Sequence, residues 1–301
     1  MLSPCSRVDA AASSLLLGQW MAVLARNLLA SACSLAAIAC STPHAEPATR
    51  SVPYAVTGLR ARAAAVAASA AASSTGDPAA ALKPAPVFKW PESNQRIPLN
   101  MPVGRAEAWA PVHPPSQGGA PVSVFFHGIT AYAQLECPVA WGAMQHGWVV
   151  CADGNIPYGG GFTWNNSGSQ ARVDAAVGAL TARHQDLVGA QRGVIIGYSI
   201  GAMAAWYLLE HSSERWTALA FINAEFGVDP KVVQAKGLKR VAMIAARGDL
   251  TFRTMSRTAA SLAREGIDAR FFSFESRNGH FFDDETANKL VGPLEWALTG
   301  N

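Results

Sequence analysis

From about residue 105 to residue 298, short apolar runs alternate with longer segments of helical periodicity. Apolar runs bounded by turn residues indicate buried strands, and apolar positions that recur every three or four residues indicate helices. The predicted strands are Arg105–Val112, Pro121–Phe126, Trp148–Ala152, Gly193–Ile196, Ala218–Asn223, Arg240–Ala245 and Ala269–Phe274. Helices are expected at 137–146, 170–182, 202–210, 253–264 and 284–298. This alternation predicts an α/β fold, with a mostly parallel sheet covered by helices on both faces.

The first 40 residues have a different pattern. A segment carrying Arg26 precedes the small, apolar run Leu28–Ala39, and Cys40 follows. This order is typical of a secretory signal peptide, and the apolar run is too short to span a bilayer. Ala37–Cys40 also resembles a lipoprotein cleavage site, although Ala37 stands where leucine is usual. Simple secretion and membrane attachment through a lipidated Cys40 both stay open. Either alternative predicts an extracytoplasmic protein, which is secreted, periplasmic or lipid-anchored.

Residues 41–86 are rich in alanine, serine, threonine and proline and have few large apolar side chains. Such a composition cannot bury a core, so we expect a disordered linker here and a catalytic domain over 87–301. The full chain of 301 residues is 50% hydrophobic and 15% charged, with a formal net charge of +3. Because it has no basic stripe, a nucleic-acid partner is not expected.

Two of the five cysteines, Cys137 and Cys151, lie within the predicted catalytic domain. In an exported protein such a pair suggests a disulfide, but sequence alone does not place their Cα atoms within bridging distance. Cys151 also lies in an apolar strand, where a cysteine can serve as a small buried hydrophobe. Both interpretations stay open.

The segment Gly197–Gly201, with the sequence GYSIG, carries the strongest chemical signal. It follows a predicted strand and precedes a predicted helix, which is the context of a nucleophile elbow. The two glycines give room for a strained turn, and the turn lifts Ser199 to the carboxyl ends of the strands. The backbone N–H of Ile200 would then point toward a developing oxyanion. The alternative is an ordinary strand–helix turn in which Ser199 only caps the helix.

A serine hydroxyl needs a base, and the base needs an orienting carboxylate. His280 follows the last predicted strand, whereas His211 comes too soon after the elbow, so His280 is the expected base. Asp249 follows the preceding strand in a loop that can reach this histidine. The rivals of Asp249, Glu225 and Asp229, follow the strand before that. The predicted triad is therefore Ser199, Asp249 and His280.

His127–Gly128, the elbow, Gly248–Asp249 and Gly279–His280 together resemble the α/β-hydrolase superfamily. The resemblance covers about residues 100–298 and is greatest to compact bacterial esterases of the dienelactone-hydrolase and polyester-depolymerase kind. It implies the α/β-hydrolase fold. It also implies that the backbone N–H of Ile129 is the second oxyanion donor and that His127 supports this loop.

The short segment between residues 223 and 240 leaves little room for a lid, so we expect little or no lid and an open site. Aromatic residues beside the strand ends, Tyr198, Trp164 and Phe252 foremost, are expected to bind substrate, although aromatics also fill cores. Phe162 and Phe226 are weaker candidates. The triglycine 159–161 lacks the context of a phosphate loop and is expected to be a flexible loop.

These features predict a serine hydrolase, most plainly a carboxylesterase, that forms an acyl-enzyme with a small or polymeric ester. No metal-binding sequence pattern is found, so no metal or other cofactor is expected. Two alternatives stay open: a peptidase or amidase of the same fold, and a non-catalytic surface-binding lipoprotein that keeps the scaffold.

Overall fold

The computed structural model describes residues 95–276, 279–281 and 284–301. The predicted signal peptide with Cys40, the predicted linker 41–86 and the first residues of the predicted catalytic domain, 87–94, lie outside the described residues. Within the described ranges, no helix has the length and apolar character needed to cross a bilayer.

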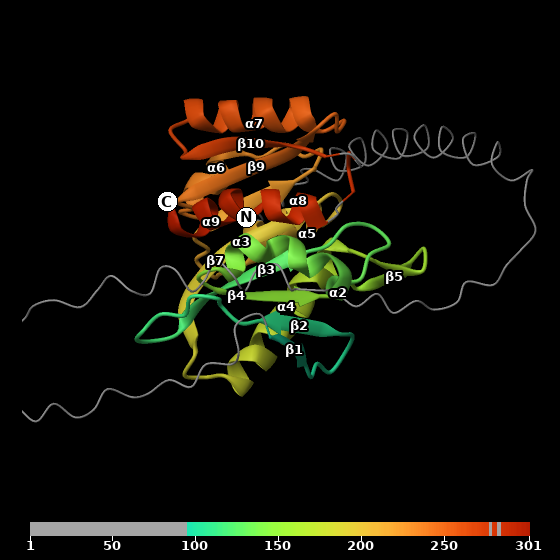
Figure 1. The fold of residues 1–301 in the computed structure, drawn as a ribbon, viewed down its shortest axis with the longest axis vertical. Helices are drawn as coiled ribbons and strands as arrows, with labels where there is room; N and C mark the ends of the chain where they lie inside the picture. Colours follow the sequence, from blue (N-terminus) through green and yellow to red (C-terminus); the bar gives the residue numbers. More distant parts are fainter. Residues whose placement is uncertain (1–94, 277–278, 282–283) are drawn as a thin grey trace, which may run out of the picture. The chain divides into compact units, whose positions relative to one another are not determined.

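Eight of the described strands form one sheet in the order β1-β2-β4-β3-β7-β8-β9-β10 (Figure 1). Neighbouring strands from β4 to β10 are parallel, whereas β2 is antiparallel to both β4 and β1. The strands are β1 Arg96–Leu99, β2 Ala106–Trp109, β3 Ala120–Phe126, β4 Trp148–Ala152, β7 Val188–Tyr198, β8 Ala218–Ile222, β9 Arg240–Arg247 and β10 Ala269–Glu275. A separate antiparallel hairpin joins β5 Ile156–Tyr158 to β6 Gly161–Thr163.

Helices cover both faces of the sheet. The helices are α2 Ala133–Glu136, the 3-10 helix η2 Cys137–Ala140, α3 Trp141–Met144, α4 Asn166–Arg183, α5 Gly201–His211, α6 Pro230–Ala235, α7 Phe252–Arg264, α8 Asp284–Lys289 and α9 Val291–Thr299. Apolar side chains of α4 to α7 form one core cluster with the sheet, and those of α2, η2, α3 and α9 form the other. Because both faces are covered, β4 and β8 are buried at every position. This explains their continuous apolar sequences.

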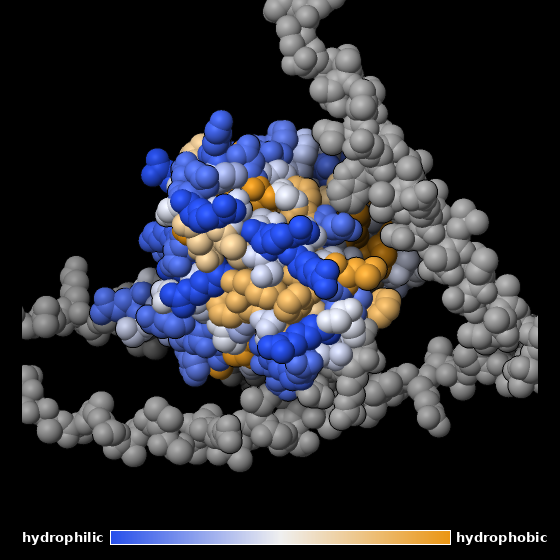
Figure 2. All heavy atoms as spheres, turned by 90° about the horizontal axis from the view of Figure 1, so that it is seen from above, coloured by the Kyte–Doolittle hydropathy of each residue, from blue (hydrophilic) through white to orange (hydrophobic). Residues whose placement is uncertain are grey.

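Helix α7 shows how one amphipathic element closes a face. Met255, Ala259 and Leu262 are buried against the sheet, whereas Arg253 and Arg257 are exposed on the opposite side of the helix. Figure 2 looks onto this side of the domain and shows hydrophilic side chains over much of it. The apolar stripe therefore supplies the packing of α7, and the arginines lie in solvent.

The predicted strands and helices are found, with differences that have local causes. The expected helix 137–146 is broken into η2 and α3, because Pro138 cannot donate the backbone hydrogen bond that would continue α2. The expected helix 284–298 is divided at Leu290, and Pro293 lies in the first turn of α9, where proline is tolerated. Residues 159–161 are not a free loop: they include the turn and first β6 residue of the β5–β6 hairpin. The sequence pattern did not predict β1, α6 or this hairpin.

The strand order and directions are those of the α/β-hydrolase fold, which confirms the predicted fold class. Between β8 and β9 the only described helix is α6, of six residues. The described residues therefore place no large helical lid in this connection.

Candidate active site

Ser199 lies on the turn between β7 and α5 with a φ of 52°, a left-handed conformation that is rare for a residue with a side chain. The flanking glycines are required by packing. A Cβ atom on Gly197 would clash with the Cα of Ala202, and one on Gly201 would clash with the carbonyl of Phe126. The turn therefore packs directly against β3 and the first turn of α5, and it holds Ser199 in one strained conformation.

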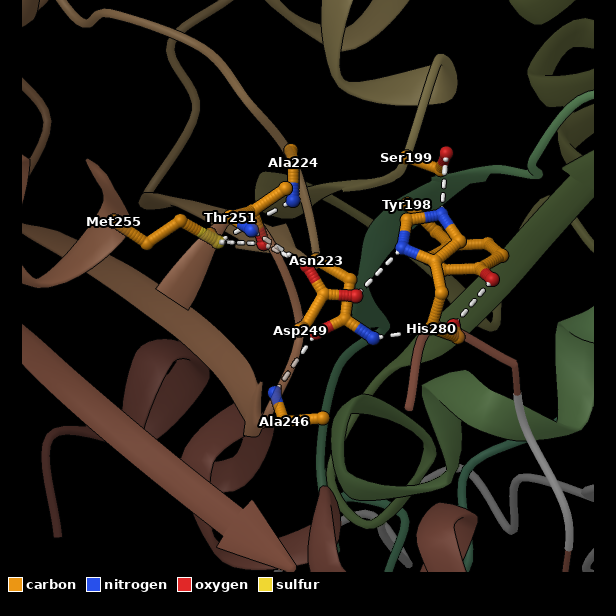
Figure 3. A network of polar contacts seen from close by, with 9 residues as sticks. All are labelled: Tyr198, Ser199, Asn223, Ala224, Ala246, Asp249, Thr251, Met255 and His280. Carbon is orange, nitrogen blue, oxygen red and sulfur yellow. Dashed lines mark hydrogen bonds and ion pairs between the residues drawn. The ribbon is translucent and has the colours of Figure 1, made fainter. Parts of the chain in front are cut away.

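Ser199, His280 and Asp249 form a continuous hydrogen-bonded chain (Figure 3). The Ser199 hydroxyl lies 2.9 Å from His280 Nε2, and His280 Nδ1 lies 2.7 Å from Asp249 Oδ2. A carboxylate can only accept, so Nδ1 carries the proton and Nε2 is free to accept from the serine. The three residues follow β7, β9 and β10, whose carboxyl ends meet at one edge of the sheet.

Asp249 is buried, and it is held as an anion. Its Oδ1 accepts hydrogen bonds from the backbone N–H of Thr251 at 2.7 Å and from the Thr251 hydroxyl at 2.6 Å. Burial alone would raise the pKa of Asp249, but the hydrogen bonds from His280 and Thr251 outweigh it and hold the pKa below its usual range. The rival carboxylates lie elsewhere: Asp229 caps α6 and Glu225 is exposed.

The backbone of His280 is held from two sides. The Tyr198 hydroxyl donates to the carbonyl of His280 at 2.7 Å, and Asn223 Nδ2 donates to the same oxygen at 3.2 Å. Asn223 is buried with a φ of 45°, and its Oδ1 accepts from the backbone N–H of Ala246 at 2.9 Å. Burial raises the pKa of Tyr198, so its hydroxyl stays protonated and able to donate. These contacts fix the histidine loop relative to β7, β8 and β9.

Two backbone N–H groups were expected to form an oxyanion hole. Ile200 is the N-cap residue of α5, and Ile129 lies in the loop that follows β3. Neither N–H donates to an acceptor among the described residues. The loop of Ile129 is ordered by His127, whose Nε2 accepts from the N–H of Gly154 at 2.7 Å and whose Nδ1 lies 2.7 Å from the carbonyl of Gly128. Burial lowers the pKa of His127, so the ring is neutral and Nδ1 donates.

Of the aromatic residues expected to bind substrate, Trp164 and Tyr198 are buried and Phe252 is half-buried, and their contact with substrate stays a prediction. Trp164 is 8% exposed and donates its Nε1 hydrogen to the carbonyl of His127 at 3.0 Å, so it supports this loop from behind. Tyr198 is buried, and its hydroxyl donates to the backbone carbonyl of His280. Phe252 packs edge to face on Phe271, with ring centroids 5.0 Å apart. The weaker candidates pack similarly, Phe162 on Tyr132 and Phe226 on Trp206.

Exposed apolar side chains next to the site come from other positions. Ile129, Leu250 and Phe281 are 44%, 93% and 69% exposed, and we call these three residues the apolar rim. Leu250 adjoins Asp249, and Phe281 adjoins His280.

Cys137 and Cys151 form a disulfide, with their Cα atoms 6.0 Å apart. The bond joins η2 to β4, and both residues are buried. Within the described residues, no group of three or more histidine, cysteine or acidic side chains is arranged to hold a metal ion.

Two polar residues beside the site, Asn223 and Glu136, were not predicted from the sequence. Asn223 directly follows β8 at the same sheet edge as the triad, and a polar residue at this position was a usable signal. Glu136 lies eight residues beyond Gly128, whose N–H donates to its Oε2 at 2.8 Å. A single glutamate in a short helical segment gives no such signal.

No protein-family model and no curated protein matches the sequence. Among solved structures, a carboxylesterase from Mesorhizobium loti is similar over 65% of this chain and 96% of its own, at 17% identity and a TM-score of 0.43. The carboxylesterase of Bacillus cereus covers 60% of this chain and 92% of its own, at 17% identity and a TM-score of 0.42. A protein of Xanthomonas campestris, described as an a/b serine hydrolase without lid, covers 70% and 95%, at 15% identity and a TM-score of 0.43. Since these likenesses are distant, the fold assignment rests on the strand order, and the chemistry rests on the geometry of the site.

Proposed function

We propose that the protein is a serine hydrolase that cleaves carboxylic esters through an acyl-enzyme. The observation that carries this proposal is the chain of hydrogen bonds from Ser199 through both ring nitrogens of His280 to Asp249. The tautomer that this chain imposes is the one in which His280 can take the serine proton. A serine that only capped α5 would not need a histidine and a buried carboxylate behind it.

The proposed reaction has two steps. Ser199 Oγ attacks the ester carbonyl carbon while its proton passes to His280 Nε2, and the imidazolium is stabilised by Asp249. The oxyanion accepts hydrogen bonds from the N–H groups of Ile200 and Ile129. His280 then gives the proton to the leaving alcohol, which departs and leaves an acyl-serine. A water that His280 deprotonates attacks this ester, and the proton returns to Ser199 as the acid is released.

The surroundings of the site support an ester with an apolar acyl part. The apolar rim lies beside the triad, and the short β8–β9 connection holds no large helix that would cover it. Bulky or polymeric esters are therefore within the proposed substrate range. Esters and amides react through the same machinery, so peptide anilides belong in the substrate panel.

The test compares the full chain with Ser199→Ala on p-nitrophenyl esters. We expect Ser199→Ala to lower kcat by at least about 10³-fold, because the nucleophile is lost while the fold is kept. Labelling by a fluorophosphonate should disappear in parallel. Ser213→Ala, at an exposed serine after α5, is the matched control and should behave as wild type. Retained ester hydrolysis in Ser199→Ala would exclude this serine as the nucleophile, and unlabelled, inactive wild type would favour a binding protein.

A further inference from the structure

Glu136 contacts the loop that carries the proposed second oxyanion donor. The N–H of Gly128 donates to Glu136 Oε2 at 2.8 Å, and Ile129 is the next residue. On the other side of Gly128, its carbonyl accepts from His127 Nδ1 at 2.7 Å. These two hydrogen bonds hold the two successive peptide planes that meet at Gly128. The second plane includes the N–H of Ile129, because a peptide unit is planar.

Gly128 needs such external support. A Cβ atom at this position would lie 2.8 Å from the ring of Tyr198, so packing requires glycine there. Glycine has the greatest backbone freedom of any residue, and therefore the loop cannot be stiffened by its own side chain. Hydrogen bonds from neighbouring elements must fix the direction of the Ile129 N–H.

Glu136 is itself fixed at both ends of its segment. The N–H of Ala133, at the start of α2, donates to Asp153 Oδ1 at 2.9 Å. The residue after Glu136 is Cys137, which is bonded to Cys151 in β4. Both anchors lie at or just beyond β4, so the carboxylate is held at a set distance from the sheet edge.

The Glu136 carboxylate is buried, which disfavours its charged form. Burial raises the pKa of Glu136 to about 7, and the Gly128 hydrogen bond and the nearby His280 lower it only in part. The titratable groups that face it are His280 and the Tyr198 hydroxyl. An alanine or leucine would avoid this cost, so the position of the carboxylate needs an explanation beyond packing.

We propose that Glu136 is a positioning residue for the oxyanion hole. Its carboxylate holds the His127–Gly128 peptide, and this fixes the position of Gly128, from which the next peptide directs the Ile129 N–H toward the reacting carbonyl. The role rests on the proposed ester hydrolysis. It acts through Gly128 and requires no contact between Glu136 and substrate. The disulfide beside Glu136 secures the same arrangement.

The test uses the full chain with three substitutions of Glu136. Glu136→Gln keeps an acceptor for Gly128 and should keep kcat within about threefold of wild type. Glu136→Leu removes the acceptor. Glu136→Asp shortens the side chain by one methylene, so its carboxylate no longer reaches the Gly128 N–H. Both should lower kcat by roughly 10- to 100-fold with little change in KM, somewhat less than loss of a whole oxyanion donor. Glu210→Leu, at an exposed glutamate of α5, is the matched control.

Kinetics are expressed per fluorophosphonate-titrated site, so that loss of folded protein does not count as loss of rate. A second measurement is hydrogen exchange of peptides that span 127–132, which we expect to be faster in Glu136→Leu and Glu136→Asp than in Glu136→Gln. Wild-type kcat per site in Glu136→Leu and Glu136→Asp would overturn the proposal, as would unchanged exchange of the loop in both. If wild type hydrolyses no ester, the proposed function fails, and the exchange measurement still decides whether Glu136 holds the loop.

Discussion

Two carboxylates flank His280, and their surroundings shift their pKa values in opposite directions. Asp249 accepts three hydrogen bonds, which hold its pKa below the usual range despite burial. Glu136 accepts a hydrogen bond from the backbone N–H of Gly128, and burial raises its pKa to about 7. The number of donors around each group decides which of the two is a permanent anion. The two pKa shifts agree with different roles, because Asp249 orients His280 and Glu136 supports the Gly128 loop.

The raised pKa of Glu136 predicts a pH-dependent cost in stability. In the unfolded chain Glu136 titrates near 4.5, and in the folded protein near 7. Between these values the folded state binds more protons than the unfolded state, so the free energy of unfolding falls as pH rises. Glu136→Gln has no charge to bury. We therefore expect its stability relative to wild type to increase as pH rises from 4.5 through 7, measured by urea unfolding across this range.

Glu210→Gln, at an exposed glutamate, is the control for this comparison and should follow the wild-type curve at every pH. Stability curves of Glu136→Gln and wild type that stay parallel from acid to neutral pH would contradict the buried charge.

At the scale of elements, the disulfide joins a short helical segment to the sheet. η2 and its neighbours α2 and α3 have four residues each, and helices of this length are not stable by themselves. Their place against β4 depends on packing and on Cys137–Cys151. Disulfides persist in oxidising compartments, which agrees with the export predicted from residues 1–40. Export itself stays a prediction.

We expect Cys137→Ala/Cys151→Ala to lower the free energy of unfolding by about 3 kcal/mol, the usual value for a closed loop of this length. The bonded residues are 14 apart in sequence. Guanidinium unfolding of the double variant and of oxidised wild type measures the difference. Reduced wild type should resemble the double variant, and a loss well below 1 kcal/mol would show that packing alone holds η2.

The sequence was most informative where an element depends on its own residues. The runs that became β4 and β8 are apolar throughout, and the elbow has its glycines at the two positions where a side chain would clash. Pro138 and Pro293 lie in the first turns of η2 and α9, next to the two helix breaks, and both are visible in the sequence. Residues whose role depends on distant partners could not be predicted in this way. Glu136 and Trp164 acquire their roles only through the loop at Gly128, and their orientation is set by tertiary packing.

At the scale of the whole domain, the apolar rim gathers one exposed side chain from each of three loops. Ile129 follows β3, Leu250 follows β9 and Phe281 follows β10. Leu250, at 93% exposed, contributes little to the stability of the fold. Its position beside Asp249 suits contact with the acyl part of an ester.

We expect Leu250→Asp to lower kcat/KM for p-nitrophenyl octanoate relative to the acetate by roughly 3- to 10-fold, since each buried methylene contributes about 0.8 kcal/mol. The melting temperature should not change. Val103→Asp, at another exposed apolar residue in the β1–β2 connection, is the control and should leave the ratio unaltered. An equal loss on both esters would mean that Leu250 does not contact the acyl chain.

The parallel order of β7, β8, β9 and β10 has a consequence for the order in which the site forms during folding. Ser199 and His280 are 81 residues apart, and they meet only when β10 has paired with β9. Contacts so distant in sequence form late, after the loops between them have closed. A chain in which β10 has not yet joined the sheet would carry Ser199 without its hydrogen-bond partner His280. Under the proposed function, ester hydrolysis would therefore begin only after the last strand has paired, and the activity would measure the fraction of fully folded domains.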